Sequence, residues 1–230
     1  MSWHAVGFGY GPMKSPHWST RLEVELSKPQ TLRVLDKASI ARLAQGQSPG
    51  LSNPSIDRWI RESITVGRLQ RVVRGLYLNR FTHPVAQPCE AAVWLRSGAI
   101  ISLQTVLGDS GVWNNYTDWI TAVIPLSKRY SIPSLGRTDT DAAIFVFRGI
   151  PERVLEQGAE KDRLARQLPY RRATPEAALL HWLYLARSPR SRMSPPPKDL
   201  DFAALDARRL NRLARAMQLG DALHEWRQNC

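Results

Sequence analysis

Arginine side chains cluster in the short stretch RVVRGLYLNR, which occupies residues 71–80. Arg71, Arg74 and Arg80 lie there around a hydrophobic run with one glycine, and Arg68 precedes them. No acidic residue lies between the first and the last of these four arginines. Because a guanidinium group pairs well with phosphate oxygens, the stretch indicates contact with an anionic partner such as the DNA backbone. The alternative is a surface hairpin whose arginines only face solvent.

A second set of polar and basic side chains lies in the predicted helix that contains Pro54. Its sequence SIDRWIRES places apolar residues on one face and leaves Arg58 and Arg61, three residues apart, on the other. Asn53 and Ser55 lie at its start. A helix that enters the major groove needs polar groups for base edges and basic groups for phosphates. The predicted DNA-binding residues are Asn53, Ser55, Arg58, Arg61, Arg68, Arg71, Arg74 and Arg80.

Two predicted helices must position these side chains. Asp36 is a suitable N-cap for the helix DKASIARLAQG, and the segment QSPGLS after it is typical of a turn. Ser52 or Asn53 then caps the next helix, and Pro54 lies in its first turn, where a missing N–H is tolerated. These signals predict two consecutive helices joined by a turn.

A basic hairpin is predicted to follow the second helix. Residues 69–73 and 76–78 are rich in Leu, Val and Tyr, and an Arg-Gly pair joins them. Alternation along the first strand is expected to send Val72 and Val73 to opposite faces. The order helix, turn, helix and basic hairpin predicts a winged helix-turn-helix.

The segment FTHPVAQP predicts a boundary between two domains, because its two prolines interrupt regular structure. Residues 1–20, rich in glycine and proline, are expected to form an irregular arm, and residues 21–84 the winged helix-turn-helix. In residues 85–230, WITAVIPL and AAIFVFRGI are predicted strands, and Thr174 followed by Pro-Glu predicts a helix start. The predicted fold class is α+β, a winged helix-turn-helix followed by a mixed α/β domain that ends in helices.

The charge of the chain supports a polyanionic partner. The formal net charge is +12 and the isoelectric point is about 10.4. Residues 1–84 hold 12 Lys and Arg against 5 Asp and Glu, whereas residues 85–230 hold 20 against 15. The excess is therefore densest in the predicted DNA-binding domain, and nucleic acid is the expected partner.

The remaining composition indicates a cytoplasmic protein without a membrane partner. The two cysteines, Cys89 and Cys230, form no disulfide framework. The N-terminus MSWHAVGFGYGPMK lacks the continuous apolar core of a signal peptide, and the longest apolar runs are too short to span a bilayer.

Two pairs of aspartates have the spacing of possible Mg²⁺ ligands. Asp139 and Asp141 form one D-x-D pair, and Asp199 and Asp201 form the other. Neither pair has a third acidic residue or a phosphate-binding loop nearby, and the five histidines show no ligand spacing. We therefore expect no metal and no cofactor.

Three further side chains could in principle do chemistry. His181 lies in a strongly apolar helix, which favours a hydrogen-bonded core residue, and Ser102 is expected to be the N-cap of LQTVLGDSG. Cys89 starts a predicted helix, which would lower its pKa, but has no visible partner. We expect no enzyme. The alternative is a nucleic-acid-processing enzyme whose winged helix delivers substrate, and a cluster of carboxylates would favour it.

Three short sequence motifs follow one another along the chain. Residues 74–77 have the sequence RGLY, residues 98–107 have GAIISLQTVL, and residues 174–179 have TPEAAL. In this order and spacing the chain resembles, over roughly residues 31–227, the AbiEi antitoxin family of type IV toxin–antitoxin (abortive infection) systems. The first twenty or so residues match nothing in that family.

The resemblance implies a two-part function in phage defence. The N-terminal domain would bind inverted repeats in its own promoter and repress transcription of the operon. The C-terminal domain would counteract a cognate nucleotidyltransferase toxin, directly or through the toxin's substrate. The chain lacks a Gly-Ser pair followed at a distance by Asp-x-Asp, the pattern of a nucleotidyltransferase, so it resembles the antitoxin and not the toxin.

Arginines also recur in the C-terminal part of the chain. The spacing of Arg208, Arg212 and Arg215 places them on one face of a predicted helix, with leucines largely on the other. This pattern fits a solvated face or a surface for the toxin or its RNA or nucleotide substrate. The candidate antitoxin surface consists of Arg171, Arg172, Arg208, Arg212 and Arg215.

Overall fold

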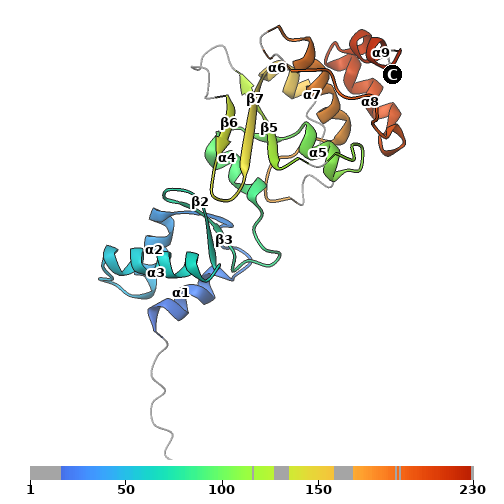
Figure 1. Ribbon diagram of the computed structural model, residues 1–230. Coiled ribbons are helices and arrows are strands. Elements are labelled where there is room, and N and C mark those ends of the chain that lie inside the picture. Colours follow the sequence, from blue (N-terminus) through green and yellow to red (C-terminus); the bar gives the residue numbers. More distant parts are fainter. Residues whose placement is uncertain are drawn as a thin grey trace, which may run out of the picture.

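The computed structural model describes residues 17–115, 117–126, 135–157, 168–189, 191 and 193–228. They form an α+β fold with two small sheets, each accompanied by its own helices (Figure 1). The mixed α and β class predicted from the sequence is confirmed.

The first unit combines three helices with an antiparallel sheet. Its elements are α1 (Trp18–Leu26), β1 (Val34–Asp36), α2 (Lys37–Gln47), α3 (Asn53–Thr65), β2 (Leu69–Val73) and β3 (Leu76–Asn79). The strand order is β1-β3-β2, and the helices lie on one side of the sheet (Figure 1). As predicted, Asp36 caps α2: its carboxylate accepts a hydrogen bond of 2.7 Å from the Ser39 backbone N–H.

Helix α1 changes the predicted start of this unit. The prediction of an irregular arm over residues 1–20 is wrong for its last three residues, because α1 begins at Trp18. Residues 1–16 of the predicted arm lie outside the described part of the chain. Leu22 and Leu26 are fully buried and anchor the helix in the first core. The start was hard to predict because the cap is His17, whose ring accepts from the Ser19 N–H, and histidine is not among the preferred caps.

The small sheet has a hydrophobic core on each face. On β3, Tyr77 packs with helices α1–α3, whereas its neighbours Leu76 and Leu78 belong to the core of the second unit. On β1, Leu35 faces the first core and Val34 the second. Alternate side chains of a strand point to opposite faces, so both faces are covered. The sheet is a layer that the two units share.

A β-bulge in β2 overturns the predicted alternation of Val72 and Val73. The pairing of β2 with β3 shifts register between Arg71 and Val73. As a result Val72 is fully buried in the second core, and Val73 packs against the same core. Gly75 turns the hairpin with a φ of 84°, a value that residues with a Cβ rarely adopt.

The second unit is built on a mixed sheet in the order β4-β5-β7-β6. Strands β5 and β7 are parallel, and the two outer strands pair antiparallel to them. Its elements are η1 (Pro88–Ala91), α4 (Ala92–Leu95), β4 (Ile100–Ile101), α5 (Gln104–Asp109), β5 (Trp119–Leu126), β6 (Gly136–Asp139), β7 (Ile144–Pro151), α6 (Glu152–Gln157), α7 (Pro175–Arg187), η3 (Phe202–Ala204), α8 (Ala207–Ala216) and α9 (Gly220–Gln228). The two strands predicted from WITAVIPL and AAIFVFRGI are confirmed as β5 and β7.

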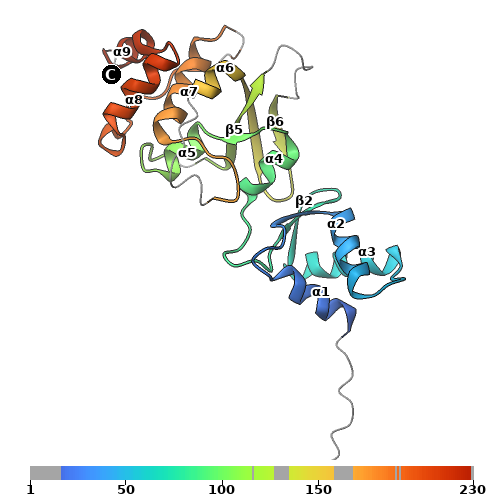
Figure 2. The same ribbon diagram turned by 180° about the vertical axis from the view of Figure 1, so that it is seen from behind.

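Helix α7 lies at the centre of the second unit. It is buried along most of its length, next to the sheet and α5, with α8 and α9 on its outer side (Figures 1 and 2). Thr174 caps it as predicted, because its hydroxyl accepts a hydrogen bond of 3.2 Å from the Ala177 N–H. The prediction that this domain ends in helices is confirmed by α8 and α9, which are both amphipathic.

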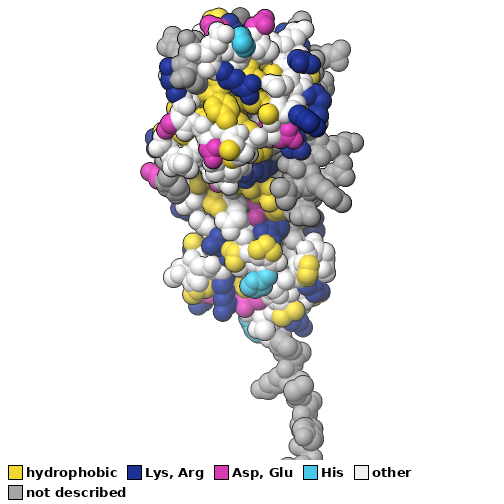
Figure 3. Space-filling model, turned by 90° about the vertical axis from the view of Figure 1, so that its right-hand side faces the viewer, with side chains coloured by type: hydrophobic (Ala, Val, Ile, Leu, Met, Phe, Trp, Pro, Cys, Tyr) yellow, Lys and Arg dark blue, Asp and Glu magenta, His cyan; other side chains and the backbone are white. Residues whose placement is uncertain are grey.

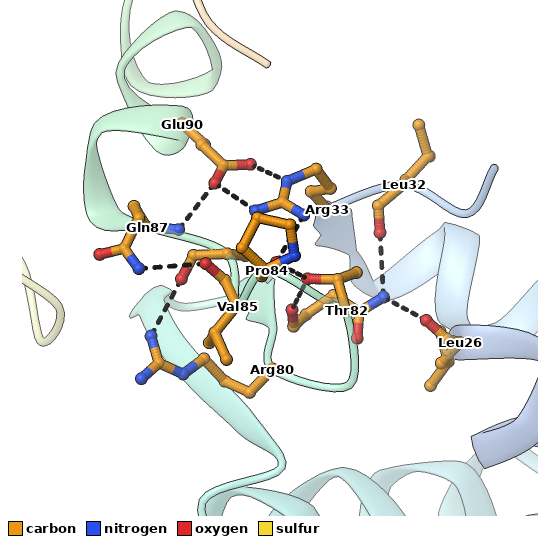
Figure 4. Close-up of polar contacts among 11 residues, drawn as sticks. Leu26, Leu32, Arg33, Arg80, Thr82, Pro84, Val85, Gln87 and Glu90 are labelled. Atoms are coloured by element: carbon orange, nitrogen blue, oxygen red, sulfur yellow. Dashed lines mark hydrogen bonds and ion pairs between the residues drawn. The ribbon is translucent and has the colours of Figure 1, made fainter. Parts of the chain in front are cut away.

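An ion pair between Arg33 and Glu90 joins the units beside the segment that connects them (Figure 4). The Glu90 side chain is 2% exposed and accepts bonds of 2.7 and 2.9 Å from the Arg33 guanidinium, which raise the pKa of Arg33. Glu90 also accepts a 2.7 Å bond from the Gln87 backbone N–H, and Arg33 donates at 2.8 Å to the Pro84 carbonyl. The pair therefore holds β1, the connecting segment and η1 together.

Ser102 and His181 form a buried hydrogen bond within the second core. The Ser102 hydroxyl lies 2.8 Å from Nδ1 of His181, so the predicted N-cap role of Ser102 is wrong. Helix α5 instead begins at Gln104, after Leu103 with a φ of 59°. The prediction that His181 is a hydrogen-bonded core residue is confirmed, although its Nε2 is buried without a partner. Burial lowers the pKa of His181 to about 4.

We expect Glu90→Gln to lower the free energy of unfolding by about 3 kcal/mol, because it leaves the Arg33 guanidinium without its buried carboxylate. Urea denaturation measures this change. Glu62→Gln is a matched control, since Glu62 forms an exposed pair with Arg58 and the loss of that pair should leave stability nearly unchanged. Equal stabilities of the two variants would contradict the role given to Arg33 and Glu90.

We expect stability to fall in acid through His181. Its pKa is about 4 in the folded protein and 6.5 when unperturbed, so the unfolded chain binds more protons between these values. The stabilising contribution is complete above about pH 6.5 and declines towards about pH 4, by on the order of 3 kcal/mol in all. Urea denaturation of the wild type and of His181→Gln across this range should give a shallower pH dependence for the variant. Parallel curves would exclude His181 as the cause.

Candidate nucleic-acid interface

Helix α3 presents its polar residues away from the first core. Ile56, Trp59 and Ile60 are buried, and they fix which face of the helix is exposed. Of the predicted DNA-binding residues in this helix, Asn53, Arg58 and Arg61 are exposed and Ser55 is half-buried. The Ser55 hydroxyl lies 3.0 Å from that of Ser52, at the start of the helix.

The arginines of α3 differ in their surroundings. Nε of Arg58 donates a 2.8 Å hydrogen bond to Glu62 one turn later, which raises the pKa of Arg58. Arg61 has no ion-pair partner within the described ranges and lies on the side of α3 that faces β2. Arg61 is therefore available to an external anion without the loss of an internal contact.

The four arginines around the hairpin also have different partners. Arg68 pairs with Glu23 of α1 at 2.5 Å, and Arg80 donates a 2.9 Å hydrogen bond to the Ala86 carbonyl. Arg71 pairs with a residue of the second unit, described below. Arg74, at the tip, is exposed and has no ion-pair partner among the residues described. The predicted basic surface thus contains free and internally paired guanidinium groups.

A hollow of about 650 Å³ lies between the C-terminal half of α3 and strand β2. Three of the predicted DNA-binding residues, Arg61, Arg71 and Arg80, line it together. Asp141, from the turn between β6 and β7, lines it from the second unit and pairs with Arg71. The structure therefore brings the hairpin and helix arginines together and adds one carboxylate to them.

The role of Asp141 was not predicted from the sequence. The sequence indicates only that Asp141 belongs to a D-x-D pair, because its partner Arg71 lies 70 residues away along the chain. Asp139, its neighbour in that pair, forms an exposed ion pair of 2.8 Å with Arg137. Among the described residues no group of three or more His, Cys, Asp or Glu side chains is placed to hold a metal ion.

The arginines of α8 form an exposed row, as their spacing predicts. Arg208, Arg212 and Arg215 are exposed, whereas Leu210 and Leu213 are buried on the opposite side. Figure 3 shows Lys and Arg side chains gathered around a hydrophobic area in the upper part of the molecule, where the second unit lies. This face combines positive charge with apolar surface.

The other two residues of the candidate antitoxin surface differ from each other. Arg171 is exposed, but the Arg172 side chain is only 17% exposed and donates a 2.7 Å hydrogen bond to Asp109 of α5. Arg172 therefore ties the segment before α7 to α5. Cys89 lies close to this pair, and burial raises the pKa of its thiol to about 11, opposite to the lowering expected from a helix start.

No helix in the described part of the chain is long and apolar enough to span a bilayer.

No protein-family model matches the chain. No curated protein matches it either. Among solved structures, the chain is similar to the RV2827C protein from Mycobacterium tuberculosis, with 20% sequence identity and a TM-score of 0.54. The match covers 90% of this chain and 77% of that one. At this identity the likeness shows that both proteins share a fold that extends across both units.

Proposed function

We propose that the protein is a DNA-binding repressor of its own operon and an antitoxin that counteracts a cognate nucleotidyltransferase toxin. The observation that carries the DNA-binding part is the exposed α3 helix beside an arginine-rich hairpin, with Arg61, Arg71 and Arg80 around one hollow. The element order α1-β1-α2-α3-β2-β3, with strand order β1-β3-β2, supports the interpretation of this unit as a winged helix-turn-helix.

In this proposal α3 enters the major groove of double-stranded DNA. Asn53 and Arg58 then reach base edges or nearby phosphates, because they lie on the exposed face of the helix. Arg74, at the tip of the hairpin, contacts the backbone or the adjacent minor groove. Each chain presents one such helix, so the inverted repeats implied by the AbiEi resemblance would bind two copies.

The antitoxin part of the proposal rests on the resemblance to the AbiEi family and on the surface of α8. An exposed row of arginines suits an acidic surface on the toxin or the RNA or nucleotide on which the toxin acts. Charged groups at the edge of an interface mainly alter the association rate and the salt dependence of binding. The α8 row would therefore speed encounter with the target more than it anchors the complex.

We expect Arg61→Ala/Arg74→Ala to weaken binding to the protein's own upstream DNA by at least about tenfold near 0.1 M salt, because two phosphate contacts are lost. Fluorescence anisotropy across salt concentrations measures this. The wild type should give a log–log slope of several units, and the variant a slope smaller by about 1.8, or about 0.9 per phosphate. Arg208→Ala/Arg215→Ala removes the same charge from α8 and should bind normally. Equal binding by both double variants would contradict the proposed interface.

We expect Arg208→Glu/Arg212→Glu/Arg215→Glu to weaken neutralisation of the co-expressed toxin while operator binding stays within about threefold of wild type. Growth of cells at graded toxin expression measures protection. The reciprocal control is Arg58→Glu/Arg61→Glu/Arg74→Glu, which should lose operator binding and keep protection. Full protection by a folded α8 variant would mean that this row of arginines is only a solvated face.

A further inference from the structure

The hollow between α3 and β2 has the composition of an anion site. Arg61 comes from α3, Arg71 from β2 and Arg80 from the segment just after β3. Thr65 and Gln70 add a hydroxyl and an amide to the same lining. The Thr65 hydroxyl already donates a 3.0 Å hydrogen bond to the Arg61 carbonyl, so three guanidinium groups and the Gln70 amide remain as donors around about 650 Å³. This set favours a ligand with several negatively charged oxygens.

Among the described residues, Asp141 is the one acidic residue in the lining, and it comes from the other unit. Its carboxylate pairs with the Arg71 guanidinium, and both side chains are about half exposed. Its backbone N–H also donates a 3.0 Å hydrogen bond to the Val72 carbonyl of β2. The turn between β6 and β7 is therefore held against the hairpin by two contacts, and only one of them uses the carboxylate (Figure 1).

A carboxylate and a phosphodiester present the same kind of group to a guanidinium, namely charged oxygens that accept N–H bonds. An exposed ion pair contributes at most about 1 kcal/mol, so an incoming phosphate can replace the carboxylate at little cost. Arg80 uses one of its donors for the Ala86 carbonyl and keeps others for such a ligand.

We propose that this hollow binds a backbone phosphate of DNA and that the Asp141 carboxylate occupies the phosphate position in the free protein. This inference rests on the proposed DNA binding by α3 and the hairpin. The second unit then competes with DNA for Arg71 within the same chain. Whatever draws the turn between β6 and β7 off the hairpin tightens DNA binding, and DNA in turn favours that displacement.

The test compares Asp141→Asn with Asp139→Asn in the full-length chain, using the protein's upstream duplex and a salt series. Both variants remove one negative charge from β6 or the turn that follows it, but of these two residues only Asp141 lines the hollow. Asp141→Asn keeps the backbone hydrogen bond to Val72, so the turn stays in place. We expect it to bind about five- to tenfold more tightly than wild type at 0.1 M salt, with a slope steeper by about 0.9. Asp139→Asn should bind like wild type.

Adding Arg71→Ala to Asp141→Asn should remove the gain in affinity, because the freed guanidinium is then absent. An Asp141→Asn variant that binds like Asp139→Asn, or more weakly than wild type, would overturn the inference while leaving DNA binding itself intact. Weaker binding by Asp141→Asn than by the wild type would mean that Asp141 positions Arg71 for DNA. If neither the wild type nor Asp141→Asn binds the duplex at any salt concentration, the proposed function fails, and the inference fails with it.

Discussion

Burial of the small β1-β3-β2 sheet on both faces is the constraint that organises the molecule. One face covers helices α1–α3, and the other completes the core around β5, β7 and α7. Val72 and Leu78 are fully buried in that second core, so the β2–β3 hairpin is packed against the second unit. The Arg33–Glu90 pair and the contact of Asp141 with Val72 lie beside this layer and fix its orientation. The arginines of the hairpin are therefore positioned by contacts with both units.

Many guanidinium groups of the first unit are used within the protein, which changes the meaning of the high net charge. Arg33, Arg58, Arg68 and Arg71 each have a carboxylate partner. Of these four pairs, Arg33–Glu90 is largely buried and structural, whereas Arg71–Asp141 is exposed and can exchange with another anion. Charge counts along a sequence predict an anionic partner but do not separate these two kinds of arginine.

Local signals predicted much of the secondary structure, and long-range contacts limited the rest. The Asp36 and Thr174 caps and the strands β5 and β7 follow from short stretches of sequence. The bulge at Val72, the partner of Arg71 and the bond between Ser102 and His181 depend on segments far apart in the chain. The sequence contains one local signal of the shared layer, the continuous apolar run LYL in β3. Such a run is expected of a strand covered on both faces, and every residue of β3 is buried.

The double burial of the hairpin also restricts how this sequence can diverge. In a wing that projects into solvent, outward positions accept polar residues freely, but a polar side chain in place of Val72 would be buried without a partner. A change at that position must suit β3 on one side and the second unit on the other. If the first unit were exchanged for that of a distant relative, the new β1-β3-β2 sheet would meet a second unit whose core has not been selected to pack against it. The two halves of the chain must therefore be inherited, and must vary, together.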